Sequence, residues 1–153
     1  MNKPREFIKK LNTSETLFGL DFGDKTIGIA VSDKSFTIAS PITTIQRKGV
    51  IKDLRTLFNF IDEYKVGGLI FGLPLSLNGN ENERTRKVRK FIEELKLLKK
   101  IKIELYDERF STDIIYKTFK KDSQSTKKIK KKIDQQAAAY ILQGFLDNAK
   151  INN

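Results

Sequence analysis

The chain has 153 residues, a formal net charge of +11, and neither cysteine nor histidine. Its length fits one domain. The missing cysteines exclude disulfides, thiolate zinc sites and thiol nucleophiles, and the missing histidines exclude imidazole bases and serine–histidine triads. Acid–base chemistry must therefore use carboxylates, lysine, tyrosine or metal-bound water. The positive charge favours nucleic acid as a partner, because lysine and arginine displace phosphate counterions; a solvated basic surface is the alternative.

The sequence predicts a cytoplasmic protein without a membrane partner. No apolar stretch reaches the roughly 18 residues of a membrane span, and residues 1–16 lack the apolar core of a secretory signal. We expect residues 1–15 to form a short, mobile N-terminal extension. We expect residues 16–149 to form the single domain.

Three β-rich segments open this domain. Residues 17–22 are almost uninterruptedly apolar, and a short turn leads to residues 27–31, so the two segments predict an antiparallel hairpin. Residues 36–45 predict a third strand, which Pro41 makes an edge strand or an irregular one. The remaining predicted elements are a helix over 50–64, a strand over 66–71, a loop over 72–80, a helix over about 81–98, a strand over 101–106, a short helix over about 111–119, a mobile lysine-rich loop over 121–132 and a helix from 133 to about 148.

The element order is therefore βββαβαβαα. Three antiparallel strands come first, and strands then alternate with helices, which requires parallel crossovers. We therefore predict an α/β fold with a five-stranded mixed sheet and helices on both faces.

Asp21 is the most informative candidate for chemistry. It lies inside the apolar segment over residues 18–23, and an unpaired carboxylate buried there costs several kcal/mol. A divalent cation would compensate that charge, because hard cations favour oxygen ligands. The alternative is a strand-end aspartate that accepts hydrogen bonds from turn amides.

The predicted fifth strand ends at a second acidic group. Asp107 and Glu108 follow each other there, at the end of the sheet where ligands of doubly wound folds gather. Successive side chains alternate between the two faces, so only one of the pair should face Asp21, and parity alone does not choose it. Arg109 could neutralise the other acid or bind a phosphate. A surface ion-pair cluster is the alternative.

Asp134 is the third acidic candidate. It begins the last predicted helix and shares a helical face with Ala137, Ala138 and Ile141. The three alanines at 137–139 would let this helix approach the sheet closely. The alternative is a first-turn aspartate that interacts with the helix dipole.

Basic residues lie beside these acids in the sequence. The 72–80 loop leads into a helix N-terminus, where free amides attract anions, and Arg84 and Arg86 stand near that start. A basic run directly before Asp134 could follow a nucleic-acid backbone or be merely solvated; its members are Lys127, Lys128, Lys130, Lys131 and Lys132.

Four segments together resemble the YqgF/RuvX family, and they occur in that family's order. This family is a bacterial branch of the RNase H-like superfamily, related to Holliday-junction resolvases and described as pre-16S rRNA processing nucleases. The resemblance covers roughly residues 17–148. The matching segments are residues 19–33 (GLDFGDKTIGIAVSD), 71–79 (FGLPLSLNG), 107–112 (DERFST) and 134–147 (DQQAAAYILQGFLD).

The resemblance implies an RNase H-like fold and a set of acidic positions that bind Mg²⁺ or Mn²⁺. Asp21, Glu108 and Asp134 fall on those positions, and Asp107 and Arg109 belong to the same motif. Lys25 matches a basic position, whereas Thr26 stands where arginine is usual. The N-terminal extension is also longer than usual.

We therefore hypothesise a nuclease that hydrolyses phosphodiester bonds with two metal ions, one activating water and the other stabilising the leaving oxygen. Asp21, Glu108 and Asp134 would bind the ions, with Asp107 as a further catalytic candidate. The favoured substrate is the 5′ end of pre-16S rRNA in ribosome biogenesis, with ribosomal particles as further partners. Branched DNA stays open, as does the choice between monomer and homodimer.

Two other functions fit parts of the sequence. A non-cleaving RNA-binding factor in ribosome assembly or transcription would be equally basic, but it would not need acids at three separate motifs. A sugar-kinase or actin-like ATPase could use the Asp21–Gly23 turn as a phosphate loop. Such proteins normally need two lobes, for which 153 residues are too few.

Overall fold

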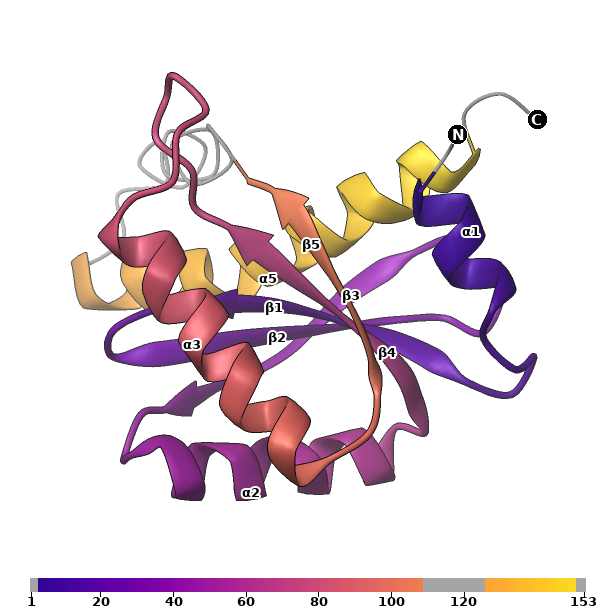
Figure 1. Ribbon diagram of the computed structural model, residues 1–153, viewed down its shortest axis with the longest axis horizontal. Helices are drawn as coiled ribbons and strands as arrows, with labels where there is room; N and C mark the ends of the chain where they lie inside the picture. The colour runs from indigo at the N-terminus through magenta and orange to yellow at the C-terminus, as the bar shows by residue number, and fades with distance from the viewer. Residues whose placement is uncertain (1–2, 109–125, 151–153) are drawn as a thin grey trace.

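Five strands form one sheet in the order β3-β2-β1-β4-β5 (Figure 1). The computed structural model describes residues 3–108 and 126–150, and for residues 126–135 it describes the backbone alone. The strands are β1 (Thr16–Phe22), β2 (Thr26–Ser32), β3 (Ala39–Gln46), β4 (Val66–Leu73) and β5 (Lys102–Asp107). β1–β2 and β2–β3 pair antiparallel, whereas β1–β4 and β4–β5 pair parallel. The predicted mixed sheet is confirmed.

Helices cover both faces of this sheet, as predicted. In the described residues they are α1 (Lys3–Lys9), α2 (Val50–Glu63), α3 (Glu83–Leu98) and α5 (Thr126–Lys150). Figure 1 shows α2 and α3 on one side of the sheet and α1 and α5 on the other. The helix predicted over 111–119 lies outside the described residues.

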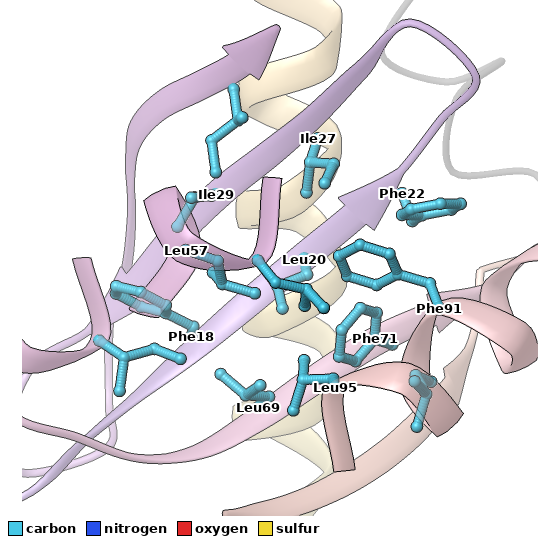
Figure 2. Close-up of a cluster of buried hydrophobic side chains, with 14 of the residues drawn as sticks. Phe18, Leu20, Phe22, Ile27, Ile29, Leu57, Leu69, Phe71, Phe91 and Leu95 are labelled. Atoms are coloured by element: carbon cyan, nitrogen blue, oxygen red, sulfur yellow. The ribbon is translucent and has the colours of Figure 1, made fainter. Parts of the chain in front are cut away.

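Alternation along the strands divides the core into two layers. On β1, Phe18 and Leu20 pack toward α2 and α3, together with the residues labelled in Figure 2, whereas Leu17 packs toward α5. The same alternation on β4 sends Phe71 to the first layer and Ile70 to the second. Because both faces are buried, β1 and β4 are apolar at almost every position.

Helix α5 lies directly against β1. A Cβ atom placed on Gly19 would lie 2.6 Å from Leu142 Cβ and 2.7 Å from the Ala138 carbonyl oxygen. Ala138 and Leu142 are themselves fully buried. The predicted close approach of the alanine-rich helix is therefore present, and it depends on a glycine in the facing strand.

The end of α5 lies beside the first helix of the chain. The ring of Phe7 in α1 is buried and meets the ring of Phe145 edge-on, with centroids 5.8 Å apart. Arg5 Nε donates to the Ala149 carbonyl oxygen at 3.2 Å. Residues 3–9 of the predicted extension therefore have a packing role that the sequence did not reveal, because Phe7 and Ile8 alone are too few apolar residues for a periodic pattern.

The lysine-rich segment corrects a second boundary. We predicted a loop over 121–132, but α5 begins at Thr126, so its backbone is helical through the whole basic run. Lysine is a good helix former, and the helix continues into a buried apolar face that stabilises it. The prediction gave charge too much weight and helix propensity too little. Residues 121–125 lie outside the described residues.

The remaining boundaries follow local sequence. β3 is an edge strand, and the register of its pairing with β2 shifts beside Pro41, as predicted. Asn82 caps α3: its side chain accepts from Thr85 N at 3.1 Å, and Thr85 Oγ1 accepts from Asn82 N at 2.8 Å. This reciprocal cap fixes the start of α3, on which Arg84 lies.

The contact between Gly19 and α5 predicts a large effect of one methyl group. Gly19→Ala should lower the free energy of unfolding by about 1–3 kcal/mol, because the facing atoms belong to helix backbone and a Cβ that cannot move alone. Urea unfolding measures this. Gly67→Ala is the matched control, since a Cβ there meets only the carboxylate end of Glu15. Equal losses in both variants would contradict the prediction.

Candidate active site

The strand alternation points Asp21 toward the α5 side of the sheet. Its neighbours Leu20 and Phe22 both pack in the opposite layer, with α2 and α3. Asp21 is only partly exposed, and its strand position pairs with Gly28 of β2. It therefore lies near the C-terminal end of β1, on the side that α5 covers.

Glu108 comes to the same place from β5. Leu105 on this strand packs toward α2 and α3, and Tyr106 packs toward α5. Glu108 is two residues after Tyr106 and so shares the α5 side with Asp21. Because β1, β4 and β5 run parallel, their C-terminal ends lie at one edge of the sheet.

Gly72 leaves the space that the Glu108 carboxylate needs at this edge of the sheet. It lies on β4, between β1 and β5, and it is the next residue after the Leu20–Phe71 pair in the register. A Cβ on Gly72 would collide with Glu108 Oε2 and with Ile141 Cδ1 of α5. The carboxylate of Glu108 therefore occupies the volume that a side chain at position 72 would take.

The surroundings of Glu108 raise its pKa to about 8, well above the usual value of 4.5. Burial is the largest cause, and the negative charge of Asp21 is the next. Arg84 opposes the shift, and Asp107 adds a smaller increase. The two acids thus lie close enough to repel each other in a poorly solvated place. Carboxylates with pKa values raised in this way are typical of functional sites.

The choice between Asp107 and Glu108, open in the sequence, is decided by this geometry. Asp107 is exposed and shares the strand face of Leu105, so it points away from the α5 side. Two other predicted residues cannot be placed beside Glu108: Arg109 and the side chain of Asp134 lie outside the described residues. Among the described side chains, no three acidic, histidine or cysteine groups form a metal-sized cluster.

The backbone of α5 nevertheless gives Asp134 a position along the sheet. Phe145, in the second half of the helix, lies beside Phe7, whose ring also borders Gly68 near the start of β4. Ala138, earlier in the helix, lies over Gly19. The helix therefore runs from the C-terminal ends of these strands toward their beginnings, and Asp134 is one turn before Ala138.

A basic pocket of about 340 Å³ adjoins the β1–β2 turn. Of the residues predicted to contact nucleic acid, Lys25 and Arg84 line it. Lys87, which was not among the predicted contacts, also lines it and pairs with Asp24 at 3.1 Å. Arg86 is exposed on α3 and outside this lining. The lysines of the basic run lie on α5, but their side chains are outside the described residues.

Arg47 holds this turn in place, a role the sequence did not suggest. Its guanidinium lies 4.4 Å from the ring centroid of Phe22 and donates to the Gly23 carbonyl at 3.2 Å. It also pairs with Asp53 of α2 at 3.1 Å. Asp53 is 1% exposed and accepts a second bond from Lys48 N at 2.9 Å. The segment directly after Asp21 is thereby tied to α2.

With this geometry in hand, comparison with known proteins gives the family. The family model described as RuvX, Holliday junction resolvase, matches residues 15–148. The chain belongs to the RuvX family. The predicted membership is confirmed, and the RuvX match includes Asp21, Glu108 and Asp134 within its limits.

Two relatives of this RuvX chain carry the name "Putative pre-16S rRNA nuclease". The one from Paramagnetospirillum magneticum is 43% identical over 145 residues, which are 95% of this chain and 94% of the relative. The one from Thermoanaerobacter pseudethanolicus is 44% identical over 135 residues, or 88% and 97% of the two chains. The prediction of a nuclease in this family is thereby confirmed.

A solved structure supports the fold. The structure of T. thermophilus RuvC with a Holliday junction substrate matches with a TM-score of 0.54 over 89% of this chain and 96% of that chain. At 9% sequence identity this likeness concerns the fold, and it confirms the predicted RNase H-like architecture. In the described part of this chain, no helix is long and apolar enough to cross a membrane.

The pKa of Glu108 predicts how stability depends on pH without metal. The folded state keeps the Glu108 proton up to about pH 8, whereas the unfolded state releases it near 4.5, so stability is lost as pH rises through this window. In EDTA, the free energy of unfolding should fall by up to about 1.4 kcal/mol per pH unit between about pH 6 and 8.

Urea titrations at several pH values test this, with Glu108→Gln as the comparison. The variant should show a flatter profile, because its amide does not ionise. No histidine titrates in this pH range, because the chain has none. Parallel profiles for both proteins would show that Glu108 titrates normally.

The Arg47 contacts predict a large loss of stability on their removal. Arg47→Met should cost about 3–5 kcal/mol, because it leaves the buried Asp53 carboxylate without its cation. Asp53→Asn with Arg47→Met should recover part of this loss, since the remaining amide carries no charge. Chemical unfolding of both variants measures these changes in stability. An Arg47→Met protein as stable as wild type would contradict the proposed role of Arg47.

Proposed function

We propose that the chain is a metal-dependent nuclease whose cleavage site is built around Asp21 and Glu108. The observation that carries this proposal is the proximity of the two carboxylates at the C-terminal edge of parallel strands, with Glu108 lying over Gly72. This is the edge at which ligands bind in open α/β sheets. The Coulomb repulsion between the acids makes the pair unfavourable unless a proton or a cation compensates it.

The donor set fits Mg²⁺ or Mn²⁺. Both side chains offer carboxylate oxygens, the ligand type that hard divalent cations prefer, and no histidine or cysteine is available for a softer metal. Asp134 is the third proposed ligand, because the direction of α5 carries its backbone toward the end of β1. Asp107 stays a weaker candidate, since its strand face is the opposite one.

A bound cation of this class polarises a phosphoryl oxygen and lowers the pKa of water. The protein's own residues would do the rest. Asp21 and Glu108 would bind the cation and hold it in position, and Glu108 would have to release its proton to do so. Lys25 and Arg84, which line the basic pocket, would hold phosphates of the substrate. In the reaction one water adds at phosphorus and one P–O bond breaks.

More distant basic residues would extend the contact with the backbone of the nucleic acid. These are the exposed Arg86 on α3, Arg109 in the acidic motif, and the run formed by Lys127, Lys128, Lys130, Lys131 and Lys132 on α5. Such contacts are independent of sequence, and they weaken as salt rises because counterions are released on binding.

The names of the relatives favour pre-16S rRNA as the substrate, cut near its 5′ end in the cytoplasm during ribosome biogenesis. Assembling ribosomal particles would then be natural partners. A Holliday junction is the second candidate, supported by the description of the family model. A non-cleaving RNA-binding protein is disfavoured, because binding alone does not need two acids forced together.

Substitution of either acid tests the proposal. Asp21→Asn and Glu108→Gln should each lower the rate of RNA cleavage in Mg²⁺ or Mn²⁺ by about 100-fold or more, since each removes a charged ligand. Gly72→Ala should also impair cleavage, because its methyl group displaces the Glu108 carboxylate. Asp62→Asn is the control: this exposed acid on α2 pairs with Lys99, outside the lining of the basic pocket.

The assay should compare precursor rRNA, a four-way DNA junction and unrelated RNA, each with Mg²⁺, with Mn²⁺ and with EDTA. We expect cleavage of precursor rRNA in either metal and none in EDTA. If Asp21→Asn cuts RNA as fast as wild type, the catalytic assignment is wrong. Preferential cutting of the junction would instead identify a resolvase.

A further inference from the structure

Tyr140 is an exposed aromatic side chain beside the candidate site. It is 45% exposed, although Ala139 and Ile141 on either side of it in α5 are buried. Ile141 Cδ1 and Glu108 Oε2 both border the space over Gly72. Tyr140 is therefore the residue directly before Ile141, which borders the acidic site.

A second tyrosine, Tyr106, is held in place near Tyr140 by its own contacts. Tyr106 Oη accepts a hydrogen bond from Asn148 Nδ2 at 2.7 Å, and its ring meets that of Phe145 edge-on at 6.3 Å. Its phenol also lies against Gly144, one turn beyond Tyr140 on α5. The phenol of Tyr140 is near enough to contribute to the raised pKa of Tyr106. Tyr140 is thus an exposed ring near the anchored Tyr106, at the end of β5.

The charges around this pair decide which part of a nucleotide fits there. Asp107 and Asp147 both act on Tyr106, and Glu108 follows on the same strand face. Phosphates would be repelled by these acids, whereas lysine and arginine attract them at the basic pocket on the other side of Asp21. A flat, uncharged base is the part of the substrate that an exposed tyrosine ring can bind beside acids.

We propose that Tyr140 stacks on an unpaired base of the RNA adjacent to the cleaved phosphate, so that the substrate is single-stranded at this position. The proposal rests on the nuclease function above and deepens it. In a duplex both faces of each base are covered by its neighbours, and only an unstacked base exposes a face to an aromatic side chain.

Binding in EDTA tests this without cleavage. The probe is a short single-stranded RNA from the 5′ precursor region, compared with the same RNA in a duplex and with a set carrying one abasic site at successive positions. Tyr140→Leu should weaken binding of the single strand by about 5- to 150-fold, the usual range for loss of one stacked base. Tyr140→Phe should bind within about twofold of wild type, since the ring is kept.

The abasic set separates stacking from a structural effect. One abasic position should weaken wild-type binding as much as Tyr140→Leu does, and the same position should have no further effect in the variant. Tyr140→Leu should leave binding of the duplex RNA unchanged. Leu97→Ala is the control, because Leu97 is 85% exposed near the end of α3, far along the helix from its start beside the basic pocket.

Three outcomes would overturn the proposal: unchanged binding by Tyr140→Leu, an equal loss on single-stranded and duplex RNA, or a changed oligomeric state that places Tyr140 between two copies of the chain. Asp21→Asn tests the proposed nuclease function separately from the proposed stacking by Tyr140. It should abolish cleavage and keep the Tyr140-dependent binding, so either proposal can fail while the other stands.

Discussion

Two carboxylates held together in a poorly solvated place are the constraint around which this structure is arranged. Asp21 and Glu108 come from strands that are not neighbours, and the Glu108 carboxylate, on which the charge of Asp21 acts, occupies the space left by the missing side chain of Gly72 on the strand between them. The raised pKa of Glu108 reflects both its burial and the charge of Asp21. A fold selected only for stability would avoid such a pair.

The surrounding structure keeps the pair from relaxing apart. Gly19 lets α5 lie against β1, which confines the α5 side of the site. Arg47 ties the turn after Asp21 to α2 through Asp53, and Asn82 fixes the start of α3 near the same edge. Rigid supports of this kind hold ligands in a precise geometry, which a metal-dependent reaction requires.

Charge is distributed so that different parts of a nucleotide are favoured in different places. Lys25, Arg84 and Lys87 line the pocket beside the β1–β2 turn. On the other side of the acids, the exposed ring of Tyr140 lies near Tyr106, on which Asp107 and Asp147 act and where a phosphate would be repelled. The proposed RNA would therefore lie across the edge of the sheet, with phosphates at the pocket and a base at Tyr140.

Local patterns predicted most of the elements correctly. The apolar runs of β1 and β4, the helical period of α2 and α3, and Pro41 in an edge strand all reflect the burial of each segment. The predictions failed where local signals were weak or misleading. Phe7 gave α1 no periodic pattern, and the lysine run concealed the first turns of α5. Both depend on packing against distant segments.

The sequence by itself determined the chemistry: carboxylates without histidine or cysteine, on a basic chain, in motifs that match the RuvX family. Tertiary structure decided which acid meets Asp21. β1 is buried on both faces and has no apolar alternation that says which side Asp21 faces, so Asp107 and Glu108 were equivalent until the sheet was assembled. The roles of Gly72 and Arg47 were hidden for the same reason, since each depends on neighbours that the chain brings together only on folding.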